Sequence, residues 1–239
     1  MRSRKLAVVV GLLVALGVAA SVGRTLYTPD WVARADPFRT QGLARLGIVD
    51  PFASDRAAET RRFDGNFRDN PRMTLVHILP GAFFLVFGFL QFSPRIRARW
   101  IAFHRWSGRV LITAACILIV PAMSFGVLTP YGGTGEAIAI ALFGALFVVF
   151  IAMGFAAIRR GDVTRHRAWM TRAFAIAVGV SVERALFGFL DAFLTPAGFR
   201  PPAIFTISIW MAWIVTAGVA ELWIRTIPPI VHAQRPATV

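Results

Sequence analysis

Cysteine and acidic residues are scarce in this sequence. Cys116 is the single cysteine, so the chain can form neither an intrachain disulfide nor a cysteine-based metal site. Charged residues make up only 16% of the chain, which is too few to cover a typical soluble domain. No HExxH metal motif, Gly-rich phosphate loop or Ser-His-acid arrangement is recognisable. The sequence therefore gives no support to hydrolase chemistry.

Long apolar runs are what the chain has in abundance. The hydrophobic fraction is 56% and the mean hydropathy is +0.63, as expected of a chain whose solvent is lipid. Each run has the length of one membrane-crossing helix, about 20 residues. We predict an all-α fold, a polytopic bundle of six transmembrane helices at residues 6–23, 73–92, 110–128, 137–158, 173–194 and 203–224.

The distribution of arginine sets the orientation. Arginines gather in the segments 93–109 and 159–172, whereas the short loops 129–135 and 195–201 contain only Arg200. Positively charged short loops stay in the cytoplasm, so both termini are predicted to be cytoplasmic. The predicted organisation is an N-terminal transmembrane anchor or uncleaved signal (1–26), an external segment with short amphipathic helices (27–72), a five-helix membrane core (73–228) and a cytoplasmic tail (229–239).

Two Asp-Pro-Phe motifs, at 36–38 and 50–52, punctuate the external segment. Aspartate suits the N-cap and proline the first turn, so each motif is predicted to start a short helix on the outer face, and a disordered connector is the alternative. Gly47 and Gly65 are the expected stops.

Short motifs recur in the third and fifth spans. Each begins with His-Arg, at 104–105 and 166–167, and each ends with Leu-Thr-Pro-x-Gly, at 128–132 and 194–198. This pattern predicts a parallel repeat in which spans 3–4 and 5–6 form two hairpins of the same orientation.

Ionisable residues inside the apolar runs form the first candidate site. Arg184 lies twelve residues beyond Arg172, which is about 18 Å along a helix and well inside the hydrocarbon layer. A charge at that depth needs partners, so an outer-leaflet polar site facing the bundle interior is expected. The alternative is a set of ion pairs that fixes helix packing without a ligand. The predicted members of this intramembrane site are His77, Glu136, Glu183, Arg184 and Asp191, with Glu221 as a further carboxylate.

A second layer lies at the predicted cytoplasmic ends of the helices. Glu221 and Arg225 are four residues apart and are expected to pair with each other. The two histidines of the repeat could hold one haem b, with arginines meeting its propionates, or the basic residues could simply contact lipid phosphates. The candidate cofactor-binding residues are His104, Arg105, Arg109, His166, Arg167 and Arg172.

Several short motifs are spread over the stretch from Asn70 to Glu221. They are His77, Gly88, Gln91-Phe92, His104-Arg105-x-x-Gly108-Arg109, Arg160-Gly161-Asp162, His166-Arg167-x-Trp169-Met170-x-Arg172, Arg184, Trp213 and Glu221. In combination they resemble a bacterial membrane family catalogued as domain of unknown function 2306. The resemblance implies a helical bundle in the bacterial inner membrane and brings no established activity.

The function that the sequence favours is non-enzymatic binding of a small molecule or lipid at polar sites between the helices. Electron transfer through a b-type haem or a quinone is the rival, and proton-coupled transport through the outer polar residues is a third possibility. The formal net charge of +14 does not indicate a nucleic-acid partner, because the arginines lie in short blocks beside apolar runs. The lipid bilayer is the expected partner, and no protein partner is indicated.

Overall fold

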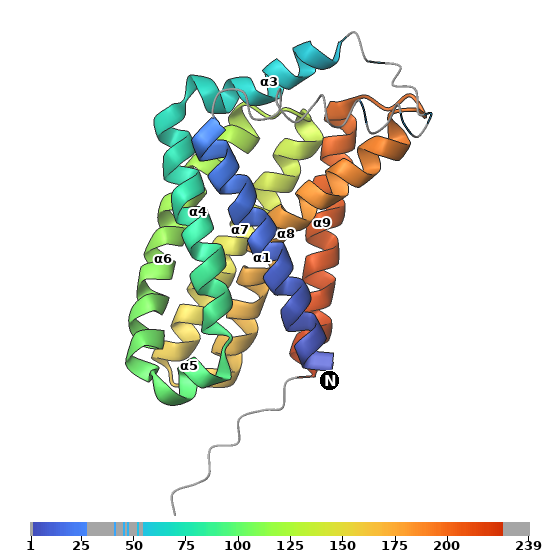
Figure 1. The fold of residues 1–239 in the computed structure, drawn as a ribbon. Coiled ribbons are helices and arrows are strands. Elements are labelled where there is room, and N and C mark those ends of the chain that lie inside the picture. The colour runs from blue at the N-terminus through green and yellow to red at the C-terminus, as the bar shows by residue number, and fades with distance from the viewer. Residues whose placement is uncertain are drawn as a thin grey trace, which may run out of the picture.

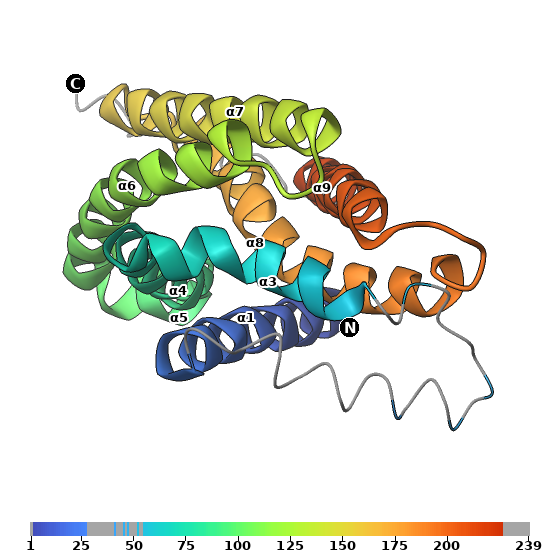
Figure 2. The same cartoon turned by 90° about the horizontal axis from the view of Figure 1, so that it is seen from above.

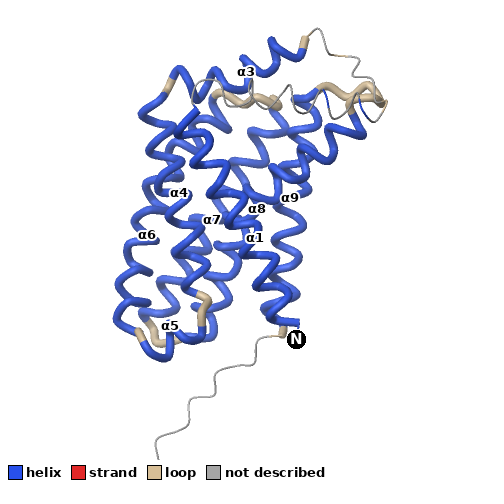
Figure 3. Tube along the Cα trace, viewed as in Figure 1, coloured by secondary structure: helices blue, strands red, loops and turns tan. Residues whose placement is uncertain are grey.

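The computed structural model describes residues 2–27 and 55–226, together with the single positions 41, 45, 47 and 52 between them. Every regular element in these ranges is helical (Figure 3). Six of the described helices are long and apolar enough to cross a membrane, which confirms the predicted all-α fold with six spans. They are α1 (Arg2–Tyr27), α4 (Pro71–Gln91), α6 (Ile101–Met123) with its π-helical continuation η1 (Ser124–Leu128), α7 (Thr134–Arg159), α8 (Val163–Leu194) and α9 (Pro201–Arg225).

Helix α8 lies at the centre of the bundle. It packs against α9, α7, α1 and α4, and α6 lies against the far side of α4 (Figure 2). Two short helices mark the ends: α3 (Arg56–Asp69) crosses one end of the bundle and α5 (Pro94–Arg99) lies at the other (Figure 1). The first residue of α1 and the last of α9 are both at the α5 end.

Local sequence explains the two turns at the α5 end. Gly161 has φ 76°, a left-handed conformation that glycine adopts without strain, and it ends α7. Asp162 then caps α8, because its carboxylate accepts a hydrogen bond from the amide of Arg165 at 2.9 Å. In the same way Ser93 caps α5 and Pro94 occupies its first turn. The two polar caps and Gly161 thus stabilise the turns at which the chain reverses. These turns position the basic side chains at the α5 end.

Helix α3 covers the other end through aromatic packing. Phe63 contacts Tyr131 with ring centroids 5.1 Å apart, and Phe67 contacts Phe125 at the same distance. A helix is present in part of the segment where two short helices were predicted, but it begins at Arg56 rather than at the motif 50–52, and Gly65 does not end it, because α3 continues to Asp69. The helix expected to start at 36–38 lies outside the described residues.

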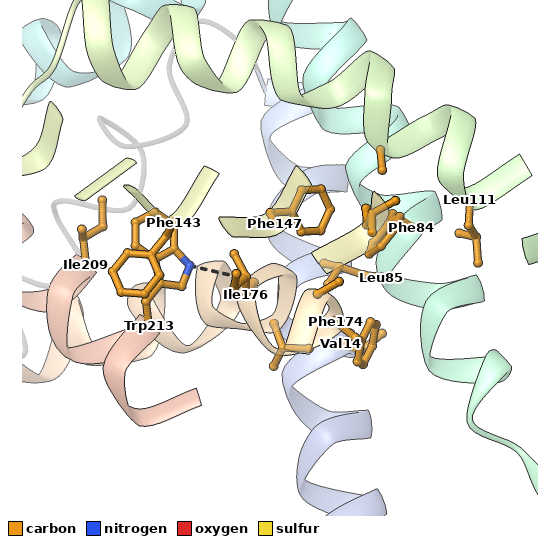
Figure 4. Close-up of a cluster of buried hydrophobic side chains, with 14 of the residues drawn as sticks. Val14, Phe84, Leu85, Leu111, Phe143, Phe147, Phe174, Ile176, Ile209 and Trp213 are labelled. Atoms are coloured by element: carbon orange, nitrogen blue, oxygen red, sulfur yellow. Dashed lines mark hydrogen bonds between the residues drawn. The ribbon is translucent and has the colours of Figure 1, made fainter. Parts of the chain in front are cut away.

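The core brings α7, α8 and α9 together around Trp213 (Figure 4). Its indole Nε1 donates to the Ile176 carbonyl at 3.0 Å, and its ring lies 4.8 Å from that of Phe143. Gly179, one turn along α8 from Ile176, lies directly beneath the indole. The absence of a side chain at this position lets α9 approach α8 closely.

The orientation of the bundle is open to a labelling test in a Cys116→Ser background. We expect a cysteine at Ala58, exposed on α3, to react with an impermeant thiol reagent in intact spheroplasts. A cysteine at Thr164, exposed at the start of α8, should react only after lysis. The reverse pattern would place the α5 end outside.

Candidate functional site

Basic side chains from three helices converge at the α5 end. His104, in the first turn of α6, experiences the charges of Arg97 on α5, of its neighbour Arg105 and of His166 on α8. Burial, followed by the charge of Arg167, lowers the pKa of Arg97 from its ordinary value. These five residues, Arg97, His104, Arg105, His166 and Arg167, are called the basic cluster below. The two histidines of the sequence repeat are therefore brought into one electrostatic neighbourhood.

Backbone carbonyls and one serine hold the cluster from the α4 side. The Arg97 guanidinium donates to the Gln91 carbonyl at 3.1 Å, which fixes α5 beneath the end of α4. The Gln91 side chain donates to the Ser107 hydroxyl at 2.8 Å, and that hydroxyl donates to the Phe103 carbonyl at 2.6 Å. These bonds link α4, α5 and α6 around His104.

His166 and His104 differ in their hydrogen bonds. Nδ1 of His166 lies 2.9 Å from the Gly154 carbonyl of α7, so the ring is oriented by the backbone. Nδ1 of His104 is buried and has no hydrogen-bond partner among the described residues. Because a buried polar nitrogen without a partner is unfavourable, His104 is the member of the cluster most in need of a ligand.

The other residues of the inner layer do not join the cluster. Arg109 on α6 is not among the charges that act on His104. Arg172 forms a two-pronged ion pair with Glu221 on α9, with its Nη2 2.9 Å from Oε2, and its guanidinium lies over the Trp169 ring at 4.6 Å. The predicted pairing of Glu221 with Arg225 is thus wrong, because Arg172 reaches across from the neighbouring helix with both guanidinium branches.

A small cavity of about 80 Å³ lies beside this ion pair, between α7, α8 and α9. Phe143, Phe150 and Ile176 form part of its apolar wall, and Arg172 and Glu221 close it. Its volume is that of a few methylene groups, so it does not hold a large cofactor.

Three of the predicted outer polar residues lie close together. Glu183 on α8 and Glu136 on α7 are both buried, and Glu183 experiences the charges of Arg184 and of Glu136. Ser208 on α9 donates to Glu183 at 3.1 Å. His77 bonds to the Leu118 carbonyl of α6 at 3.1 Å and experiences the charge of Arg184. The outer polar set thus spans α4, α7, α8 and α9.

The sequence predicted that Arg184 and Asp191 both face the bundle interior. In the structure Asp191 does and Arg184 does not. Arg184 is exposed on α8, and its Nη1 donates to the Val180 carbonyl at 2.8 Å. Glu183 takes the interior position, and the next residue, about 100° further round the helix, is on the exposed side of α8 at this depth. Asp191 is buried and accepts a hydrogen bond from Thr195 at 2.7 Å.

Arg97 is the site residue that sequence reasoning missed. It lies on a helix of only six residues, which no hydropathy window detects. The available signal was the Ser93-Pro94 pair, a combination typical of a helix start, in a segment already rich in arginine.

The comparisons with known proteins bear on the membrane core. A family model described as "Predicted membrane protein (DUF2306)" matches residues 74–224, from α4 to the end of α9. Neither the curated proteins nor the solved structures provide a match. The match includes the whole basic cluster and the outer polar residues, and leaves out α1 and α3.

Proposed function

The chain belongs to the DUF2306 family of predicted membrane proteins, and we propose that it is a non-enzymatic binding protein of the bacterial inner membrane. Its ligand is an anionic small molecule or lipid, and the basic cluster between α5, α6 and α8 is where it binds. The observation that supports this proposal is that, among the described residues, no carboxylate is paired with the positive charges of the basic cluster.

Acidic residues near the α5 end are few. Asp162 and Glu221 are the only two carboxylates in the sequence near this end, in the helix-end segments 93–109, 159–172 and 221–239. Asp162 caps α8 and lies 3.3 Å from Arg165, and Glu221 is bound to Arg172. Neither neutralises the basic cluster. Cations that lie this close together repel one another, so an anion from outside the chain would stabilise the arrangement.

The test is to identify what the purified protein retains. We expect mass spectrometry of extracts from the wild-type protein to find one class of anionic compound in near-stoichiometric amount. An Arg97→Gln, Arg167→Gln double variant should lose it, because each substitution removes a charge from the cluster. A matched control, Arg159→Gln, removes an exposed charge at the end of α7 and should retain the compound. Equal retention by all three proteins would contradict the proposal.

One observation favours a second candidate, binding of a haem b. The Nδ1 contact of His166 with the Gly154 carbonyl is the arrangement that fixes an imidazole for metal ligation through Nε2. His104 on α6 would be the second residue to hold the haem iron, and arginines would meet the propionates. Absorption spectra of the oxidised and dithionite-reduced protein, expressed with haem precursor, decide the matter. A Soret band lost in both His104→Ala and His166→Ala would replace anion binding by haem binding.

A further inference from the structure

The basic cluster contains two kinds of hydrogen-bond donor, guanidinium groups and imidazole rings. Three of its members are arginines, whose planar guanidinium groups present paired N–H donors to an oxyanion. The fourth and fifth are imidazoles, which donate through both ring nitrogens when protonated. Arg97, His104 and Arg167 lie on three different helices, and the charge of Arg97 acts on His104 while that of Arg167 acts on Arg97.

The buried nitrogen of His104 is an independent sign of a ligand. Its Nδ1 is shielded from solvent, yet no acceptor or donor among the described residues contacts it. The neighbouring Ser107 hydroxyl is engaged with Gln91 and the Phe103 carbonyl. A ligand oxygen at this position would satisfy the ring nitrogen that the chain leaves without a partner.

Aromatic residues show the depth at which this site lies. Trp100 and Trp106, at the start of α6, are 65% and 62% exposed and flank His104 in the sequence. Tryptophan favours the level of the lipid headgroups, so the cluster lies where headgroup phosphates are found and where the cytoplasm also has access.

We propose that the basic cluster binds a terminal phosphate group, a phosphate monoester, carried by a membrane lipid or by a soluble molecule. A monoester carries up to two negative charges and three terminal oxygens, whereas a carboxylate offers one charge and two oxygens. Three arginines and His104 can therefore be matched by a phosphate and only partly by a carboxylate. This inference rests on the proposed function, since it names the class of its anion.

Native mass spectrometry of the full-length protein in a neutral detergent tests it with three probes. Dioleoyl phosphatidic acid supplies a phosphate monoester on a lipid, oleate supplies a carboxylate on a similar chain, and inorganic phosphate supplies the free ion. We expect phosphatidic acid to bind at least tenfold more tightly than oleate. Arg97→Gln and Arg167→Gln should each weaken its binding by about tenfold or more, since bonds to charged groups contribute about 1.5–3 kcal/mol.

Two controls separate a binding role from a structural one. Arg159→Gln removes an exposed charge and should leave phosphatidic acid binding unchanged. His104→Leu should weaken binding by about tenfold, and His104→Gln, which keeps an N–H donor, should weaken it less. This pair keeps the test decisive if Arg97→Gln misfolds through loss of its bond to Gln91.

The outcomes distinguish the two proposals. Inorganic phosphate that displaces phosphatidic acid at millimolar concentration supports a soluble phosphate ester as the ligand, and failure to displace it supports a lipid. Oleate binding as tightly as phosphatidic acid, with the same arginine dependence, would overturn the phosphate inference and leave anion binding intact. Arginine-independent binding, or no binding of any probe, would overturn both.

Discussion

Gly179→Ala is expected to lower the free energy of unfolding by about 3 kcal/mol, the upper part of the range for overfilling a packed core. The added methyl group would lie 2.8 Å from Nε1 of Trp213 and closer still to its Cδ1. The indole cannot move aside easily, because it is buried, hydrogen-bonded to Ile176 and packed on Phe143. Titration of the purified protein with SDS in mixed micelles measures the change.

Gly218→Ala is the matched control for this substitution. Gly218 lies on α9 and a methyl group there meets nothing within 4 Å. Alanine favours helix over glycine by about 1 kcal/mol, so this variant should be as stable as the wild type or slightly more. Equal destabilisation of both variants would show that the close approach of α8 and α9 at Trp213 is not the reason why Gly179→Ala lowers the stability.

Arg172→Ala is expected to destabilise the protein by about 2 kcal/mol. Removing one member of a buried ion pair costs about 3–5 kcal/mol, but here water screens the pair, since the side chains are 23% and 44% exposed. The variant also loses the stacking of the guanidinium on Trp169. A double-mutant cycle with Glu221→Ala should give a coupling energy of about 1–2 kcal/mol, measured by the same titration.

Arg225→Ala tests the partner of Glu221 directly. Arg225 lies one turn beyond Glu221 on α9 and is exposed. Its removal should change stability by less than about 0.5 kcal/mol, the usual value for an exposed helix pair. A loss as large as that of Arg172→Ala would mean that the ion pair within α9, rather than the one across helices, stabilises the fold.

Features that depend on composition along the chain could be predicted from the sequence. Runs of apolar residues identified all six spans, because each must cross the bilayer within one segment. Helix ends were predicted less well. Helix α8 starts at Val163 rather than at 173, since Arg165, Arg167 and Arg172 lower the local hydropathy without interrupting the helix.

Contacts between helices could not be predicted in the same way. Spacing along α9 favoured Arg225 as the partner of Glu221, whereas the rotation of α8 brings Arg172 there. Adjacent charges at 183 and 184 gave no sign of which would face inward, and the structure buries Glu183. Of the basic cluster, the sequence analysis had named the two histidines, Arg105 and Arg167. Arg97 could be added only once the position of α5 was known.

Helix α1 packs through Gly17, which lies against Leu85 of α4 and Ser181 of α8. Ser181 is synthesised roughly 160 residues after Gly17, and translation proceeds at about 5–20 residues per second. Helix α1 therefore remains in the bilayer for roughly 10–30 s before its partner on α8 exists. Until α4 and α8 have been made, its own sequence must keep it there, in keeping with an uninterrupted apolar stretch from Leu6 to Gly23 with most of its side chains left outside the core. Assembly of this protein thus has a built-in order: α1 can pair with α4 as soon as α4 has been made, and its contact with α8 forms later.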